Sequence, residues 1–253
     1  MKGLPLFFLC LSITGTTLFA DSVYTLDLKK DIIIGSAALG LFVPALILEP
    51  SAGETHEKSD INVIDRSLMF SYNKPLDVIS TAAGITALVL PGISVIENIR
   101  DKHVLATYGI MYAEAFLLTH GTKDLLKYFV ARNRPYTYSG GIPSGEEDDY
   151  FNSFPSGHTA YAFLGATFLS VTFSAEYPDS KWKIPIIAGS YTIAAGVGMM
   201  RIFSGNHFLT DVLTGACIGS LYGWLIPRLH LRKDGTGVSF QPLPGGMIVS
   251  LSF

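Results

Sequence analysis

Residues 155–175 read PSGHTAYAFLGATFLSVTFSA, a polar turn of Pro, Ser, Gly and His followed at once by a long apolar run. The run from Gly157 to Ala175 contains no Asp, Glu, Lys or Arg, and it is long enough for a helix that crosses a membrane. A helix that begins here leaves its first backbone N–H groups without partners, and such groups bind anions. The sequence therefore predicts a long apolar helix whose first turn holds a charged ligand.

Two further polar clusters lie on either side of this stretch, within residues 127–135 and 201–211, each at the edge of an apolar segment. Arginine grips two oxygens of a phosphate-like anion with its planar fork, and lysine adds a point charge. A serine adds a hydroxyl, and a glycine allows close backbone approach. Together the clusters predict a site that holds a tetrahedral oxyanion and attacks it with a histidine. The candidate residues are Lys127, Arg134, Ser156, Gly157, His158, Arg201, His207 and Asp211.

The spacing of the third cluster favours a direct contact between a histidine and a carboxylate. His207 and Asp211 are four residues apart, so they share a face if a helix begins there. A carboxylate bonded to one ring nitrogen fixes the tautomer and leaves the other nitrogen free to attack. We therefore expect Asp211 to hydrogen-bond His207.

The order and internal spacing of the three clusters resemble the tripartite signature of the type 2 phosphatidic acid phosphatase superfamily, which also includes bacterial acid phosphatases and vanadium haloperoxidases. The resemblance covers residues 104–227. It implies an all-α fold, a six-helix membrane bundle of the membrane lipid phosphatase branch. One position departs from the signature, because Met200 stands where a serine usually precedes the arginine at 201. That change removes one possible hydroxyl donor to the phosphate.

The resemblance also implies a role for each candidate residue. His207 would form a covalent phosphohistidine, and His158 would act as the general acid that protonates the leaving group. The three cations would hold the phosphate with Ser156 and Gly157, so neither a metal ion nor another cofactor is implied.

Four functions compete on this evidence. The first is a phosphatase for a membrane lipid such as phosphatidic acid, phosphatidylglycerol phosphate or undecaprenyl pyrophosphate, which makes a phosphorylated lipid and the membrane the expected partners. The others are an exported soluble acid phosphatase, a vanadate-dependent haloperoxidase and a non-catalytic membrane scaffold. A net charge of −3 gives no support for binding nucleic acid.

The composition favours a membrane protein or a very apolar helical core. Of the 253 residues, 49% are hydrophobic and 15% charged. The two cysteines, Cys10 and Cys217, predict neither a disulfide framework nor a metal site. Six apolar runs, rich in the small residues that let helices pack closely in a membrane, predict six helices. These runs cover residues 32–48, 78–96, 104–120, 157–175, 184–200 and 212–226. All are uncharged except the third, which Glu114 interrupts, and most are long enough to cross a membrane, the sixth being marginal. A soluble helical bundle with a large core is the alternative.

The two ends of the chain differ from this helical region. Residues 1–20 combine Lys2 with an apolar run and read as a signal peptide, with an uncleaved anchor helix as the alternative. Residues 21–233 form the expected helical phosphatase domain, in which the signature spans 127–211. Residues 234–253 alternate in hydrophobicity around a Pro-Gly-Gly turn and predict a short β-hairpin-like tail.

Two connections carry further signals. Leu68, Met69, Phe70 and Tyr72 favour either a short amphipathic helix at an interface or a packed connecting loop. The loop from Gly140 to Phe154 carries four consecutive acidic residues at 146–149 and is either a lid over the site or a plain solvated loop.

The distribution of Lys and Arg predicts the orientation of the bundle. With six spans, the basic residues near 29–30, 100–102, 181–183 and 228–233 fall on one side and all three signature clusters on the other. The positive-inside rule places the basic side in the cytoplasm, so the catalytic face is expected to be extracytoplasmic, which in a cell envelope means periplasmic. A cleaved signal peptide with six full spans would give the reverse orientation, and the loop charges are the stronger signal.

Overall fold

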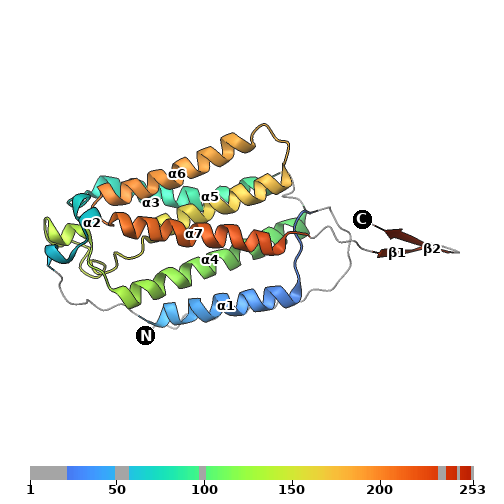
Figure 1. Cartoon of the computed structure of the whole chain (residues 1–253), viewed down its shortest axis with the longest axis horizontal. Helices are drawn as coiled ribbons and strands as arrows, with labels where there is room; N and C mark the ends of the chain where they lie inside the picture. The colour runs from blue at the N-terminus through green and yellow to red at the C-terminus, as the bar shows by residue number, and fades with distance from the viewer. Residues whose placement is uncertain (1–21, 49–56, 97–100, 233–237, 244–245, 252–253) are drawn as a thin grey trace.

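The computed structural model describes residues 22–48, 57–96, 101–232, 238–243 and 246–251. Six long helices run side by side along the molecule (Figure 1). Their bounds are Leu28–Ile47 (α1), Lys74–Val89 (α3), Lys102–Val130 (α4), Gly157–Glu176 (α5), Lys183–Phe203 (α6) and Leu209–His230 (α7). The expected all-α fold with six helices is therefore confirmed. The predicted signal peptide, residues 1–20, lies outside the described residues.

Short polar side chains start several of these helices where the sequence changes from loop to apolar run. Asp27 accepts hydrogen bonds from Lys29 N and Lys30 N at the start of α1, and Asn73 accepts one from Leu76 N at the start of α3. Asp101 does the same for the first turn of α4. Each side chain satisfies backbone donors that have no partner within the helix.

The helices differ from the predicted runs mainly in α3 and α4. The run at 78–96 divides into α3 and a 3-10 helix, Leu90–Val95 (η2), with Pro91 in its first turn. In contrast, α4 continues ten residues beyond the predicted end at 120. That extension carries polar side chains which face inward, so a search for uncharged runs stops too early.

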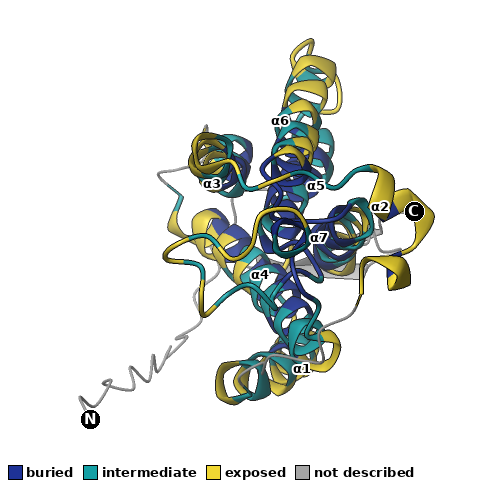
Figure 2. Ribbon diagram, turned by 90° about the vertical axis from the view of Figure 1, so that its left-hand side faces the viewer, coloured by how far each residue is buried: buried dark blue, intermediate teal, exposed yellow. Residues whose placement is uncertain are grey.

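The centre of the bundle is α5, most of whose residues are buried. Figure 2 shows it surrounded by α3, α4, α6 and α7, while α1 lies outside against α4. Leu164 and Phe168 of α5 belong to the main apolar core, together with Met111 and Tyr108 of α4. An all-round buried helix fits the uncharged sequence that predicted it.

Glycines allow α7 to lie directly on the backbone of α5. A Cβ atom at Gly219 would come within 2.0 Å of the carbonyl oxygen of Ala160, and one at Gly215 within 2.4 Å of the carbonyl oxygen of Ser156. Gly223 continues this row at four-residue spacing, with its Cβ position 2.8 Å from Leu164 O. The contact fixes the start of α7 beside the start of α5, and the second and third signature clusters lie at those two starts.

Four helical segments are long and apolar enough to cross a membrane: Leu28–Ile47, Lys74–Val95, Lys183–Phe203 and Leu209–His230. Large apolar side chains are exposed on them, including Ile33, Ile85, Ile184 and Leu221. Such a surface is costly in water and favourable in lipid. For α4 and α5, which lie further inside and carry more polar side chains, crossing the membrane stays a prediction.

The remaining described elements are short. A 3-10 helix, Lys58–Asp60 (η1), precedes Val63–Ser67 (α2), and Pro135–Tyr138 (η3) follows α4. Residues 68–73 are not helical, so the packed loop is correct for this stretch, in which Phe70 contacts Phe203 and Tyr72 contacts Tyr136. Near the C-terminus, Val238–Leu243 (β1) and Gly246–Leu251 (β2) pair antiparallel as the predicted hairpin.

Candidate active site

A cavity of about 180 Å³ lies at the end of the bundle where α4 ends and α5 begins. This is the left-hand end in Figure 1, where α6 also ends and α7 begins. Its lining combines side chains from α4, α5 and three connections. The lining residues are Lys123, Lys127, Arg134, Asp149, Gly157, His158, Tyr161 and His207. Five of the eight predicted residues therefore line one cavity, and Ser156, Arg201 and Asp211 are buried beside it.

Among the described residues that line the cavity, Lys127 is the cation without a carboxylate partner. It lies in the last turn of α4, and within the described chain its Nζ has no hydrogen-bond or ion-pair partner. Lys123, one turn earlier, is paired with the carboxylate of Asp124. Because i and i+4 share a helix face, the α4 extension presents two ammonium groups to the cavity.

Arg134 reaches the cavity after a sharp turn at the end of α4. Ala131 ends the helix in the left-handed region, with φ 42°, a conformation that helix ends commonly use to reverse the chain. The guanidinium of Arg134 is buried and each of its three nitrogens has a partner: Nε donates to Asp149 O at 2.9 Å, Nη1 donates to Asn206 Oδ1 at 2.7 Å, and Nη2 is paired with the Asp149 carboxylate. A carboxylate therefore sits where an anionic ligand would bind.

That carboxylate comes from the acidic loop, which folds over the cavity. Besides Asp149, Glu146 of this loop accepts a hydrogen bond from Tyr72 at 3.2 Å. These contacts favour the lid over the plain solvated loop among the two alternatives that the sequence left open.

Arg201 lies in the last turn of α6 and is 2% exposed. Its Nη1 is paired with Asp77 and donates to Ser80 Oγ at 3.2 Å, while its Nε is buried without a partner. A buried N–H group without an acceptor costs free energy, so this donor is available to a ligand.

The first turn of α5 carries the middle cluster. No side chain caps this helix, so its early backbone N–H groups stay available for an anion. Ser156 Oγ lies 2.9 Å from Thr159 Oγ1, and Ser156 N donates to Asp211 O at 3.0 Å. His158 faces the cavity with Nε2 at 3.2 Å from Thr81 Oγ1 of α3.

His207 lies in the connection between α6 and α7 and is 1% exposed. Its Nδ1 is 2.6 Å from the carbonyl oxygen of Ser153. A carbonyl only accepts hydrogen bonds, so Nδ1 carries the proton and Nε2 keeps its lone pair. Burial, followed by the positive charges of Arg201 and Arg134, holds the pKa of His207 well below its ordinary value. The ring is therefore neutral near pH 7, and the lone pair on Nε2 can act as a nucleophile.

The predicted hydrogen bond between Asp211 and His207 is wrong. Asp211 Oδ2 lies 3.8 Å from His207 Nδ1, and it accepts instead from Ser153 Oγ at 2.5 Å and Phe208 N at 2.8 Å. The reason is local: α7 begins at Leu209, so His207 precedes the helix and Asp211 caps it. Asp211 thus orients the histidine through Ser153, whose backbone carbonyl holds the ring.

Several residues of the site were not predicted from the sequence. Arg132 bridges Asp211 and the fully buried Asp65, with Nη1 at 2.6 Å and Nη2 at 2.8 Å from the respective carboxylates. Asp65 also accepts from Thr210 N and Thr210 Oγ1. The four-residue spacing from Lys127 could have identified Lys123. The carboxylates at 65 and 77 gave no signal, because their partners are distant in sequence. Asp149 was noted as part of the acidic loop, but its pairing with Arg134 was not predicted.

With this geometry described, the chain can be compared with known proteins. The sequence profile of the PAP2 superfamily matches residues 107–234, half of the chain, and this protein belongs to that superfamily. The match includes all eight predicted site residues.

Individual relatives are lipid phosphatases. The chain is 37% identical over 94 residues to the lipid A 1-phosphatase of Porphyromonas gingivalis, covering 36% of this chain and 19% of the relative. It is 26% identical to a probable diacylglycerol pyrophosphate phosphatase of Schizosaccharomyces pombe, covering 56% of this chain and 59% of the relative. It is 35% identical to phosphatidylglycerophosphatase B of Bacillus subtilis, covering 44% of this chain and 54% of the relative. The matched part is less than two thirds of the length of each of these relatives.

A solved structure is also similar. The crystal structure of a transmembrane PAP2 type phosphatidylglycerolphosphate phosphatase from Bacillus subtilis is 22% identical, with a TM-score of 0.49, covering 79% of this chain and 95% of that chain.

Proposed function

We propose that this protein is a metal-independent phosphatase that hydrolyses a phosphomonoester or pyrophosphate of a membrane lipid through a phosphohistidine intermediate. One observation carries the proposal: a neutral histidine, His207, borders a cavity in which Lys127 has a free ammonium group. A nucleophile and a preorganised positive charge are the two components that phosphoryl transfer requires.

In the proposed first step, His207 Nε2 attacks phosphorus, an N–P bond forms and the P–O bond to the lipid breaks. His158, in its protonated form, gives a proton to the leaving oxygen and becomes neutral. In the second step, water gives a proton to His158 and attacks the phosphohistidine, which releases phosphate and restores the neutral ring. Lys127, Arg134 and Arg201 hold the non-bridging oxygens with the donors at Ser156 and Gly157, and Asp211 positions His207 through Ser153.

A lipid is the proposed substrate for two reasons. The names of the relatives specify lipid A, diacylglycerol pyrophosphate, phosphatidylglycerophosphate and, in Sulfolobus acidocaldarius, undecaprenyl diphosphate as substrates. In addition, four helical segments are of membrane-crossing length and composition, and the cavity lies at one end of them, at the level expected for lipid headgroups.

The proposed organisation is a catalytic domain at residues 21–233, preceded by the signal segment 1–20 and followed by the tail 234–253. We also propose that the catalytic end is extracytoplasmic. Basic residues gather at the opposite end, where α1, α4 and α6 begin and α7 ends. An isolated bridge between Tyr24 and Leu231 places the start of α1 at that basic end. If all six helices cross, this orientation requires that residues 1–20 are not removed.

Phosphate release from purified, detergent-solubilised protein tests the function. The substrates are lipid phosphomonoesters, lipid pyrophosphates and water-soluble phosphomonoesters. We expect turnover of at least one lipid class that greatly exceeds turnover of the soluble esters. Vanadate, which resembles the trigonal-bipyramidal state, should inhibit, and EDTA should leave the rate unchanged.

Two outcomes would contradict the proposal. Preference for water-soluble esters would favour the broad acid phosphatase. Loss of activity in EDTA that magnesium restores would overturn the metal-independent mechanism.

A further inference from the structure

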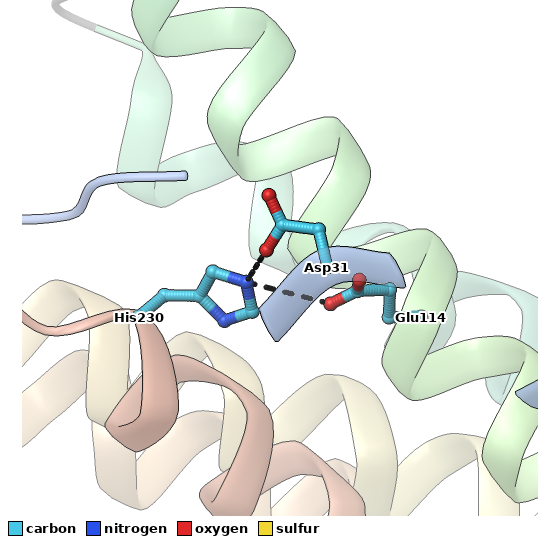
Figure 3. A group of neighbouring side chains, drawn as sticks. All are labelled: Asp31, Glu114 and His230. Carbon is cyan, nitrogen blue, oxygen red and sulfur yellow. Dashed lines mark hydrogen bonds and ion pairs between the residues drawn. The ribbon is translucent and has the colours of Figure 1, made fainter. Parts of the chain in front are cut away.

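Far from the catalytic cavity, three helices bring two carboxylates and an imidazole together. Asp31 of α1, Glu114 of α4 and His230 of α7 each point one ligand atom toward a common centre, and these atoms all lie within 4.8 Å of one another (Figure 3). His230 Nε2 is 2.9 Å from Asp31 Oδ1 and 3.5 Å from Glu114 Oε2. At about 1.5 Å per helical residue, His230 is about 28 Å along α7 from Asp211.

The tautomer of His230 is fixed by its other nitrogen. Nδ1 lies 2.9 Å from the carbonyl oxygen of Ile226, and a carbonyl cannot donate, so Nδ1 carries the proton. In the neutral ring Nε2 then presents a lone pair, directed at the oxygens of two carboxylates. Such a cluster is held together either by a proton on Nε2, which is then donated to Asp31 Oδ1, or by a metal cation that lies between the three ligand atoms. Metal-bound histidines commonly use the same arrangement, a carbonyl on one nitrogen and the metal on the other.

Burial makes this demand for a cation stronger. His230 is 1% exposed and Glu114 is 6% exposed, and Glu114 Oε2 is buried without a hydrogen-bond partner. Asp31 and Glu114 share His230 as an ion-pair partner. Two negative charges in such a place are costly unless they are neutralised, and a divalent ion supplies the matching charge.

We propose that Asp31, Glu114 and His230 form a binding site for a divalent transition-metal ion of the Zn²⁺ class. Ligand atoms held at about 2.0–2.2 Å from one Zn²⁺ lie about 3–4.4 Å apart. Two of the separations, 2.9 and 3.5 Å, lie at the short end of that range, and the widest separation in the group is at most 4.8 Å. Asp31, whose side chain is 18% exposed, leaves access for the ion and for a water ligand.

The ion would attach α1 to the rest of the bundle. α1 packs mainly against α4, through Ala38 and the partly buried Ile34 and Leu41. A metal bridging Asp31 to Glu114 and His230 joins it to α4 and α7 at the basic end. Since a site of this kind binds only the folded chain, the metal stabilises the fold by mass action.

The test uses tag-free, full-length protein in detergent, stripped with EDTA and dialysed against Zn²⁺. We expect one equivalent of bound zinc per chain and a melting temperature several degrees above that of the stripped protein. Glu114→Gln and His230→Gln should each weaken zinc binding at least tenfold. Two matched controls should keep the ion: Glu176→Gln, which alters a carboxylate bonded to Tyr108 at the same end, and His207→Ala in the catalytic cavity.

A spectroscopic measurement keeps the test independent of how the variants fold. Co²⁺ added to the stripped wild-type protein should produce the intense visible absorption of a low-symmetry site, and Zn²⁺ should remove it. The proposal is overturned if wild-type protein shows no such absorption, or if Glu114→Gln binds zinc as tightly as wild type. Neither measurement involves a phosphate substrate, so its failure would leave the proposed phosphatase activity untouched.

Discussion

Ser153 holds His207 from one side and Asp211 from the other, so the orientation of the proposed nucleophile depends on a residue outside the three clusters. We predict that His207→Ala reduces phosphate release by several orders of magnitude, because the change removes the proposed nucleophile. A labelled substrate should give an acid-labile phosphoprotein in the wild type only. His103→Ala, an exposed change on α4, is the control, and near-normal turnover in His207→Ala would refute the assignment.

His158, the second histidine of the cavity, has a different proposed role from His207. Its proposed role is to give a proton to the leaving oxygen, which matters less when that oxygen is a weak base. His158→Ala should therefore lose much less activity on an aryl phosphate than on an alkyl phosphate. Equal losses on both substrates, measured as kcat/KM, would show that His158 is not the acid.

Single residues show what the sequence could predict about the site. The signature located Lys127, Arg134, His158 and His207, because a motif specifies residue types at fixed separations. It did not predict the ring partner of His207, because α7 begins two residues after His207, so Asp211 caps the helix and does not contact the ring. The counter-ions were not predicted because a surface carboxylate and a buried one look alike in sequence.

The helix pair α5 and α7 carries the next prediction. Gly219→Ala would place a methyl group against the Ala160 carbonyl, where the Cβ position is only 2.0 Å away. Overpacking costs about 1–3 kcal/mol. A backbone contact cannot move aside as a side chain can, so the free energy of unfolding should decrease by an amount near the upper end of that range. Thermal unfolding in detergent measures the change.

Gly189→Ala is the matched control for that variant. Gly189 lies within α6, and a Cβ there meets nothing within 4 Å, so alanine should be neutral or slightly stabilising by helix propensity. If both variants melt at the same temperature as wild type, the α7 glycines are not required for close packing.

At this scale the sequence predicted much of the structure. All six predicted runs are helical, because a long apolar stretch with at most one charged residue satisfies its backbone hydrogen bonds most readily as a helix. The error in α4 has a physical origin: residues 120–127 are polar on the face that lines the cavity, and hydropathy alone cannot separate a buried polar face from a loop. The glycine row was visible in the sequence, but its partner helix was not.

For the whole molecule, the prediction concerns its orientation. The helices alternate in direction, so all connections at the cavity end lie on one side of the membrane if each helix crosses. Ser144→Cys and Asp179→Cys, both at exposed positions and each in a Cys10→Ser, Cys217→Ser background, place a thiol at opposite ends. An impermeant thiol reagent applied to intact cells should label position 144 and not position 179. The reverse pattern would show that the catalytic end is cytoplasmic.

The pairing of the cavity cations with carboxylates affects how fast the site binds a charged substrate. A carboxylate is paired with each of Arg134, Arg201 and Lys123. The net positive charge of the cavity therefore comes almost entirely from Lys127. A site close to neutral projects little field beyond the Debye length of about 8 Å at physiological salt. For a soluble phosphate ester, kcat/KM should therefore vary little with ionic strength, and Asp149→Asn, which unpairs Arg134, should make that dependence steeper. The enzyme would then recognise phosphate by exchanging one anion for another at short range, and long-range attraction would contribute little to its encounter rate.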